Sequence, residues 1–413
     1  MVDRAPGESA LRAILSDRQV LATLLLALFV NLGTGMVLPI LPLFARSLGA
    51  AYAEAGLLVG AYYLARLVFD LAAGAIVDRL GIAPAAAAGL GALALGALST
   101  GLSRSFGAAL VSWAVAGAGA AVVWAAMYNA LIRSVPRARM ARALGLFYGA
   151  FNSGLVAGGF LGGLVAARFG LPAPLLCLAA IAAGLAVLMS TALRTPPPAP
   201  NMAAPRPEGG TAEQSLEPGA LLRIPGFPAA VMSLLANLWF FGAVFNTLVP
   251  LFARDVLHLS PAGIGVLYAA ALAAEFVVYY PAGTWADTRG RRFVLMPAFA
   301  CLGVVSLLVG FSGDTLIFAL LLTVLGAASG FAGVPPAAML ADVLPEHRAA
   351  RGVAIFRFGG DIGFALGPIL CGLAAGHLGF RAAFAIAGIP SLVALLVVGL
   401  SRETLASRRV QTL

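Results

Sequence analysis

The chain has few charged residues. Only 10% of its 413 residues are charged, whereas a soluble globular protein is about 25% charged. A water-soluble fold of this size could not cover its surface with so few ionisable groups, and 61% of the residues are hydrophobic. The composition excludes a soluble enzyme, a disordered protein and a disulfide scaffold. It predicts a membrane protein with several spans.

Lysine is absent, and cysteine is rare. All 26 basic residues are arginine, so a phosphate-binding loop with a lysine is not possible and direct use of ATP is disfavoured. The arginines form short clusters between apolar runs, without the interleaved aromatics of a nucleic-acid surface. Cys177, Cys301 and Cys371 lie inside apolar runs, and the histidines lack metal-ligand spacing. We therefore expect no disulfide, cofactor, metal or nucleic-acid partner.

Long apolar runs make up most of the chain. A transmembrane helix needs about 20 mostly apolar residues, and lipid offers no partner to an exposed backbone group, so continuous runs of this length predict helices. The predicted fold class is an all-α membrane protein of twelve transmembrane helices. The expected spans are 19–45, 53–77, 83–102, 107–133, 141–167, 171–193, 228–253, 261–286, 293–312, 315–341, 350–375 and 381–401.

The sequence repeats itself at an offset of 208 to 209 residues. Pro42–Arg46 (PLFAR) recurs at Pro250–Arg254, and both halves contain a Gly-x-x-x-Asp-x-x-Gly pattern, once at Gly74, Asp78 and Gly81 and once at Gly283, Asp287 and Gly290. Two parallel six-helix halves with a long linker are a known transporter plan, in which the substrate site lies between the halves near the bilayer midplane. We expect an N-terminal segment 1–18, a first half 19–193, a proline-rich linker 194–227, a second half 228–401 and a tail 402–413.

The arginines also predict orientation. Nineteen lie in the termini and the loops on the same side as the termini, and five (Arg46, Arg104, Arg168, Arg254 and Arg381) lie in the opposite loops. Because loops rich in arginine stay in the cytoplasm, both termini are predicted to be cytoplasmic in a bacterial inner membrane. We expect a monomer in the lipid bilayer.

These motifs resemble the major facilitator superfamily, and specifically its twelve-span drug:proton antiporter-like branch. The resemblance covers essentially the whole chain. The loop 2–3 signature appears as Gly74, Asp78, Arg79 and Gly81, with Ile82 and Ala83 in place of a basic pair, and its second copy as Gly283, Asp287, Gly290, Arg291 and Arg292. The span-five antiporter signature appears as Gly154, Gly158, Gly159, Gly162 and Gly163, and its span-eleven copy as Gly363, Gly367, Pro368 and Gly372. Trp113 stands where the span-four signature carries an arginine linked to proton coupling.

The resemblance implies a gate role for the two aspartates. In the family, Asp78 would lock the gate against the N-terminus of span eleven, where a helix dipole favours an anion, and Asp287 would do so for span eight against span five. Gly74 would allow span two to approach a neighbour closely. The alternative is that both aspartates only shape a tight turn, and that the span-five glycines only serve helix packing.

Five charges lie well inside predicted spans: Arg66, Asp70, Glu275, Arg357 and Asp361. Such a group costs several kcal/mol and is functional or paired by default. Aligning spans two and eleven antiparallel at 1.5 Å per residue predicts the pairs Asp70–Arg357 and Arg66–Asp361 across the halves.

Glu275 has no basic partner in the equivalent register, where Glu275 and Tyr279 face Tyr148 and Asn152. An unpaired buried carboxylate tends to be neutralised by a proton. Glu275 is therefore the first candidate for proton coupling, followed by Asp361 and Asp70. The alternative is a protonated glutamate in a static hydrogen bond.

The remaining candidates are polar and aromatic residues inside spans, a mixture that suits an amphipathic small molecule. They are Asn31, Tyr62, Trp124, Tyr128, Asn129, Tyr148, Asn152, Trp239, Asn246, Tyr279 and Tyr280. We expect proton-driven efflux of small amphipathic compounds by alternating access. Two alternatives stay open: transport of a specific metabolite, sugar, siderophore or lipid, and a sensor or assembly partner without flux.

Overall fold

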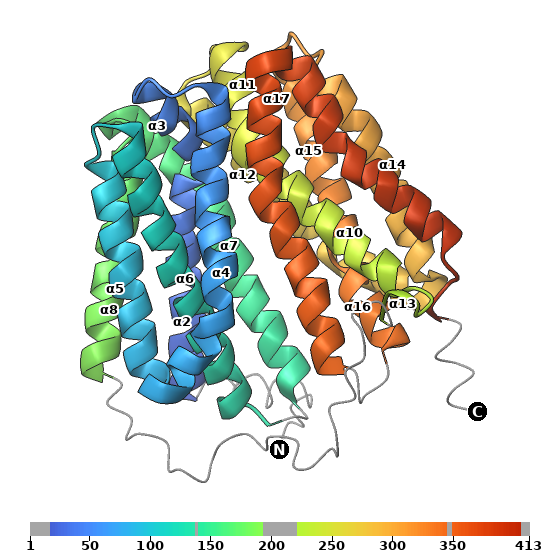
Figure 1. The fold of residues 1–413 in the computed structure, drawn as a ribbon, viewed down its shortest axis with the longest axis horizontal. Coiled ribbons are helices and arrows are strands. Elements are labelled where there is room, and N and C mark those ends of the chain that lie inside the picture. The colour runs from blue at the N-terminus through green and yellow to red at the C-terminus, as the bar shows by residue number, and fades with distance from the viewer. Residues whose placement is uncertain (1–16, 137–138, 193–220, 345–348, 406–413) are drawn as a thin grey trace, which may run out of the picture. The chain divides into compact units, whose positions relative to one another are not determined.

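The computed structural model describes residues 17–136, 139–192, 221–344 and 349–405. Nearly all of these residues are helical, and none of them forms a strand (Figure 1). The predicted all-α class is confirmed. Most of the segment 1–18, the linker 194–227 and the tail 402–413 lies outside the described residues.

The helices follow the predicted apolar runs. In the first half they are α2 (Arg18–Val37), α3 (Leu41–Ser47), α4 (Tyr52–Leu80), α5 (Ile82–Gly101), α6 (Phe106–Ser134), α7 (Met140–Phe169) and α8 (Ala173–Ala192). In the second half they are α10 (Phe227–Phe240), the π-helix η2 (Phe241–Leu248), α11 (Val249–Asp255), α12 (Pro261–Val277), α13 (Tyr279–Arg289), α14 (Arg291–Val309), α15 (Thr315–Gly333), α16 (Pro335–Val343) and α17 (Ala349–Leu400).

Eleven stretches of the described residues are long and apolar enough to cross a membrane. The last of them, Arg351–Leu400, has 50 residues, about twice what one span needs. It is broken at Gly379, whose φ of 81° and ψ of 170° are not helical. The predicted spans eleven and twelve are therefore the two arms of α17, and the twelve-helix fold is confirmed.

Gly379 belongs to a set of four positive-φ glycines at the ends of helices that the repeat duplicates. Gly81 separates α4 from α5 with a φ of 85°, and Gly290, its equivalent 209 residues later, separates α13 from α14 with a φ of 111°. Gly170, the equivalent of Gly379, ends α7 with a φ of 92°. With ψ near 160° at Gly81 and Gly290, this conformation is open essentially to glycine alone.

The described residues fall into two compact units. The first comprises those of Met1–Gly49, Ala61–Pro197 and Ser260–Ala269, and the second those of Ala50–Gly60, Pro198–Leu259 and Ala270–Leu413. The beginning of α4 thus belongs to the second unit, and the beginning of α12 to the first. The predicted domain boundaries at 193 and 228 stay predictions.

Glycine stripes bring helices together within each unit. In the first unit, Gly154, Gly158 and Gly162 on α7 have no room for a Cβ atom because they lie against the backbone of α2 at Leu28, Leu32 and Met36. In the second unit, Gly363 and Gly367 on α17 lie in the same way against Leu235 and Trp239 of α10. These contacts show the packing role expected for the span-five and span-eleven glycines.

A second face of the same glycine-rich helices packs on the exchanged segments. Gly159 and Gly163 of α7 lie against Tyr268, Pro261 and Gly265 of α12 in the first unit. In the second unit, Pro368 and Gly372 of α17 lie against Gly56 and Tyr52 of α4. The repeat therefore carries two stripes of close contact in each unit, on different faces of α7 and of the first arm of α17.

Candidate functional site

A buried carboxylate is the centre of a polar cluster in the second unit. Glu275, in the last turns of α12, is 5% exposed. Its Oε1 accepts hydrogen bonds from the Tyr279 hydroxyl at 3.1 Å and from Ser329 of α15 at 3.3 Å. Its Oε2 is buried and has no hydrogen-bond partner among the described residues. A carboxylate in this setting is costly unless it is neutralised or meets a ligand.

The cluster continues from α15 to α10. Ser329 is fully buried, and its Oγ lies 3.3 Å from Oδ1 of Asn237, which is 5% exposed. Gly326 and Gly330 bring α15 against the backbone of α12 at Ala271 and Glu275. The small residues on either side of Ser329 thus hold its hydroxyl between two helices. The described part of the chain contains no group of acidic, histidine and cysteine side chains that could hold a metal.

The position of the first unit that is equivalent to Glu275 carries a cation. Arg66, 209 residues before Glu275, lies on α4 with its Nε 3.9 Å from Oδ2 of Asp70, which is the equivalent of Tyr279. The Arg66 guanidinium also lies over the Trp124 ring at 5.3 Å from its centroid. A cation over an indole face is stabilised by the ring quadrupole. The two units therefore place opposite charges at one position of the repeat.

The position of the missing span-four arginine is filled by an aromatic stack. Trp113 is 1% exposed and stacks on Tyr62, with ring centroids 5.0 Å apart and an interplanar angle of 27°. Gly117, one turn later, lies against the Tyr62 backbone. Tyr62, predicted to line the cavity, is 5% exposed and serves this packing.

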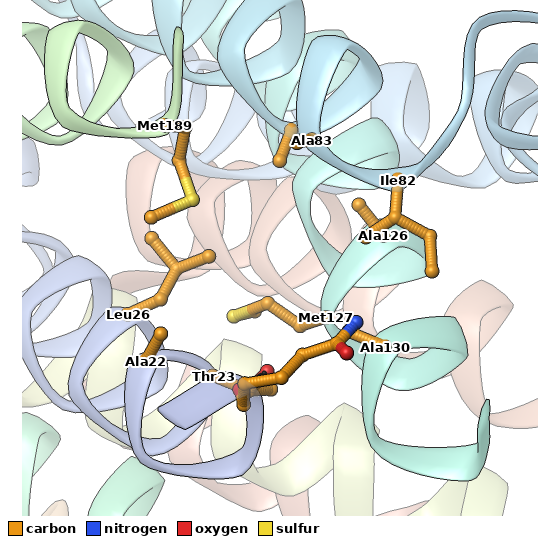
Figure 2. Close-up of a pocket in the computed structure, with 11 residues that line it drawn as sticks. Ala22, Thr23, Leu26, Ile82, Ala83, Ala126, Met127, Ala130 and Met189 are labelled. Carbon is orange, nitrogen blue, oxygen red and sulfur yellow. Dashed lines mark hydrogen bonds between the residues drawn. The ribbon is translucent and has the colours of Figure 1, made fainter. Parts of the chain in front are cut away.

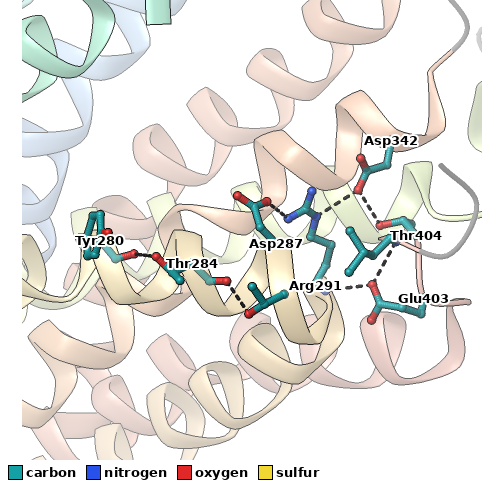
Figure 3. Close-up of polar contacts among 9 residues, drawn as sticks. Tyr280, Thr284, Asp287, Arg291, Asp342, Glu403 and Thr404 are labelled. Carbon is teal, nitrogen blue, oxygen red and sulfur yellow. Dashed lines mark hydrogen bonds and ion pairs between the residues drawn. The ribbon is translucent and has the colours of Figure 1, made fainter. Parts of the chain in front are cut away.

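The motif aspartates have partners that the sequence analysis did not foresee. At the end of α4, Asp78 forms an ion pair with Arg133 of α6 at 3.2 Å. In the second unit, Arg291 bridges two carboxylates, those of Asp287 and Asp342 (Figure 3). Asp342 is the equivalent of Arg133 at the offset of 209, so the repeat again exchanges the sign of a charge.

Figure 3 also shows the end of the described chain at this network. The Glu403 carboxylate accepts hydrogen bonds from the backbone N–H groups of Arg291 at 2.9 Å and Arg292 at 3.1 Å. It therefore caps the N-terminus of α14 from more than a hundred residues away. Thr404 donates to Asp342 at 3.3 Å, and the Arg292 guanidinium donates to the Gly399 carbonyl at 2.6 Å.

The other motif residues make few contacts. A Cβ atom at Gly74 would meet no described atom within 4 Å, and at Gly283 it would meet only Cγ1 of Val334 at 3.8 Å. The close helix approach expected at Gly74 stays a prediction, and one tight contact of α4 lies at Gly56. Arg79 is exposed.

The cavity candidates divide by environment. Asn31, Asn129 and Asn152 each donate one amide N–H to a backbone carbonyl one turn earlier, at 2.8 to 2.9 Å. Tyr280 is 85% exposed and Tyr148 45%, whereas Asn246 is fully buried inside η2. Trp239 is 9% exposed, and its indole N–H has no partner among the described residues. Trp124 and Tyr128 are half-buried.

The predicted pairs Asp70–Arg357 and Arg66–Asp361 each join a residue of one unit to a residue of the other, and they stay predictions. A pocket of the first unit, formed where α2, α5, α6 and α8 meet, is small and apolar (Figure 2). It contains none of the candidate residues. Its lining includes Thr23, Leu26, Ala83, Met127 and Met189.

Two repeated helical units with eleven long apolar stretches, and a buried carboxylate at Glu275 in the second of them, are typical of a polytopic transporter. The sequence profile of the Major Facilitator Superfamily matches residues 23–274 and 231–411, and the chain belongs to this family. It is similar to the quinolone resistance protein NorA of Staphylococcus aureus, with 25% identity over 251 residues. It is also similar to the multidrug resistance protein MdtG of Salmonella paratyphi C, with 29% identity over 153 residues.

These alignments are partial. The match to NorA covers 60% of this chain and 62% of that protein, and the match to MdtG covers 35% and 37%. Solved structures match over nearly the full length. The nucleoside transporter NupG gives a TM-score of 0.74 and 15% identity over 92% of this chain and 98% of that one. A bacterial homologue of the human lysosomal transporter Spinster gives a TM-score of 0.72 and 15% identity over 95% and 96%. At these identities the structures establish the fold.

Proposed function

We propose that this chain is a secondary active transporter that exports small, partly hydrophobic compounds in exchange for protons. Glu275 carries this proposal: it is a buried carboxylate in a predicted span, with neutral hydrogen-bond partners and no ion pair among the described residues. A group of this kind can gain and lose a proton as its surroundings alternate between closed and open. The named functions of NorA and MdtG support drug efflux as the substrate class.

The gate belongs to the same proposal. Arg66, Asp70, Arg357 and Asp361 would pair across the halves when the cytoplasmic side is closed and separate when it opens. Asp361 and Asp70 are the second candidates for proton coupling. Asp78 and Asp287 would close the loop ends of spans two and eight. Neither a catalytic residue nor a cofactor is part of the proposal.

The orientation follows from the arginine distribution. We propose that the protein is a monomer in the inner membrane, with both termini in the cytoplasm. A fusion of alkaline phosphatase to the C-terminus is expected to be inactive, and a fusion of green fluorescent protein at the same place is expected to fluoresce. The opposite pair of results would reverse the topology.

The decisive experiment measures flux in proteoliposomes. The fluorescent cation ethidium is the first probe, followed by a panel of toxic compounds that includes quinolones. We expect an imposed proton gradient to drive accumulation of at least one probe by the wild-type protein, and Glu275→Gln to abolish this accumulation while downhill flux persists.

Glu54→Gln is the matched control, because Glu54 lies at the start of α4 and its carboxylate accepts from the Ala51 N–H. Full response of Glu275→Gln to the gradient would exclude the proton role. Flux of a metabolite, sugar or lipid instead of the panel would favour the specific transporter, and absence of all flux would favour a sensor.

A further inference from the structure

The Ser329 hydroxyl lies between two acceptors and has one proton. Its Oγ is 3.3 Å from Glu275 Oε1 and 3.3 Å from Asn237 Oδ1. A hydroxyl can accept more than one hydrogen bond but can donate only one. Equal distances, both longer than the usual hydroxyl hydrogen bond, place Ser329 so that it can serve either acceptor. The protonation state of Glu275 decides which one it serves.

When Glu275 is ionised, its Oε1 is acceptor-only. Ser329 and Tyr279 then both donate to it, since hydrogen bonds to a charged acceptor are the stronger ones. The Asn237 carbonyl receives no hydrogen from Ser329 in this state. The charge on α12 thus directs the single hydroxyl proton away from α10.

When Glu275 gains a proton, the direction reverses. A proton on Oε2 would be a buried donor without a described acceptor, which carries a full desolvation cost. A proton on Oε1 can instead be donated to Ser329 Oγ. Ser329 then rotates about its Cβ–Oγ bond and donates its own proton to Asn237 Oδ1. No covalent bond of Ser329 breaks, and the one proton added to the cluster resides on Glu275.

We infer that Ser329 is a positioning residue that converts protonation of Glu275 on α12 into a new hydrogen bond to Asn237 on α10. This inference rests on the proposed proton site at Glu275. Asn237 lies about one helical turn before η2, the π-helical segment Phe241–Leu248, where span seven departs from α-helical geometry. π-Helical insertions commonly mark functional positions. Gain or loss of the buried hydrogen bond from Ser329 to Asn237 thus links protonation of Glu275 to the packing of span seven.

The surroundings of Glu275 simplify the test. From α13, Tyr279 is the titratable side chain in contact with Glu275, while α10 and α15 present the neutral Asn237 and Ser329. Gly333 leaves only 3.2 Å between an added Cβ and the Asn237 amide nitrogen, so the amide has little freedom to move. Among the described hydrogen bonds, Asn237 is linked to Glu275 through Ser329 and not directly.

Infrared difference spectroscopy of the full chain in lipid nanodiscs, at high and low pH, tests the relay without a substrate. The protonated carboxyl of Glu275 gives a carbonyl stretch band, and Glu275→Gln assigns this band by removing it. We expect Asn237→Leu to move the band position although no described hydrogen bond joins residue 237 to Glu275, because the hydrogen-bond chain loses its terminal acceptor and with it the cooperative polarisation. Ser329→Ala should move the band further, and Ser329→Thr, which keeps the hydroxyl, should leave it near the wild-type position. The double variant Asn237→Leu/Ser329→Ala should have the same band position as Ser329→Ala alone.

The outcomes separate the two proposals. If Glu275→Gln removes no pH-dependent band, Glu275 takes up no proton, and the proposed proton site fails together with the relay. If the band is assigned but Asn237→Leu and Asn237→Ala both leave it in place while Ser329→Ala moves it, the relay is wrong and the proton site stands. If Asn237→Leu does not fold, Asn237→Ala is used as the test variant in its place. In proteoliposomes, either Asn237 variant should reduce proton-driven ethidium accumulation about fivefold, the change in an equilibrium expected from one neutral hydrogen bond, and Ser329→Thr should restore it relative to Ser329→Ala.

Discussion

The Arg133 guanidinium lies 3.2 Å from the Asp78 carboxylate, and the residue equivalent to Arg133 in the second half is an aspartate. In that half the cation is Arg291, which stands at the position of Ile82 and contacts both Asp287 and Asp342. Each half therefore neutralises its motif aspartate with an arginine, supplied by α6 in one case and by α14 in the other. The basic pair that the loop 2–3 signature lacks at Ile82 and Ala83 is thus replaced from another helix.

The two arginines should differ in their effect on stability. The Arg291 and Asp342 side chains are 3% and 2% exposed, whereas those of Arg133 and Asp78 are 35% and 70% exposed. Removal of one partner from a buried pair leaves an unpaired charge and costs about 3 kcal/mol or more, and an exposed pair contributes less than about 1 kcal/mol. Arg291→Met should therefore lower the thermal unfolding midpoint of the purified protein far more than Arg133→Met does. Equal shifts would show that the buried network adds nothing specific.

The cap on α14 should be removable without unfolding the protein. Loss of a helix N-cap costs about 1 kcal/mol, so Glu403→Ala should increase hydrogen exchange at the first turn of α14 while the rest of the second unit stays protected. Glu403→Gln keeps a carbonyl oxygen but can accept fully from only one of the two N–H groups, so it should lie between wild type and alanine. Unchanged exchange at Arg291 and Arg292 in Glu403→Ala would contradict the cap.

The glycines of α7 offer an internal comparison. Gly158 has no room for a Cβ atom against Leu32, whereas Gly149 on the same helix has no atom within 4 Å of that position. Gly158→Ala should destabilise the protein by about 1 to 3 kcal/mol through overpacking. Gly149→Ala should stabilise it by up to about 1 kcal/mol through helix propensity. Thermal unfolding of both variants checks the sign, and a neutral Gly158→Ala would overturn the tight crossing of α7 and α2.

The pairing across the halves is tested by a charge exchange. Asp70→Arg and Arg357→Asp should each reduce proton-driven ethidium accumulation, because each leaves two like charges facing one another if the pair exists. Combining them restores opposite charges, so the double variant should recover most of the lost activity. Recovery no greater than that of either single variant would exclude the pair. Arg104→Asp, in the loop between α5 and α6, is the matched charge control.

Composition and apolar run length were sufficient to predict the helices, since a spanning segment must satisfy its own backbone and few alternatives exist in lipid. Motif spacing also predicted which glycines pack, as Gly158 and Gly367 show. Ion-pair partners on separate helices were harder to predict. Nothing in the local sequence links Asp78 to Arg133, although a comparison of the halves at the offset of 209 would have shown a charge exchanged at 133 and 342.

The sequence did not identify Ser329 and Asn237 as site residues, for a related reason. A serine in an apolar helix is ordinary, because its hydroxyl can bond to the backbone of its own helix. Only the packing of α15 against α12, allowed by Gly326 and Gly330, directs the Ser329 hydroxyl toward Glu275. Such contacts depend on the order of the helices in the bundle and on the rotation of each helix about its axis. The sequence of an apolar helix indicates neither of these clearly.

The single-glycine breaks at Gly81, Gly290 and Gly379 have a mechanical consequence. A connection of one residue, held in a conformation that other residues do not adopt, leaves no slack between the helices it joins. Spans two and three, eight and nine, and eleven and twelve are therefore joined by stiff bends. When one helix of such a pair tilts during a transport cycle, the other must tilt with it. Changes in the angle between consecutive helices therefore occur at the other connections.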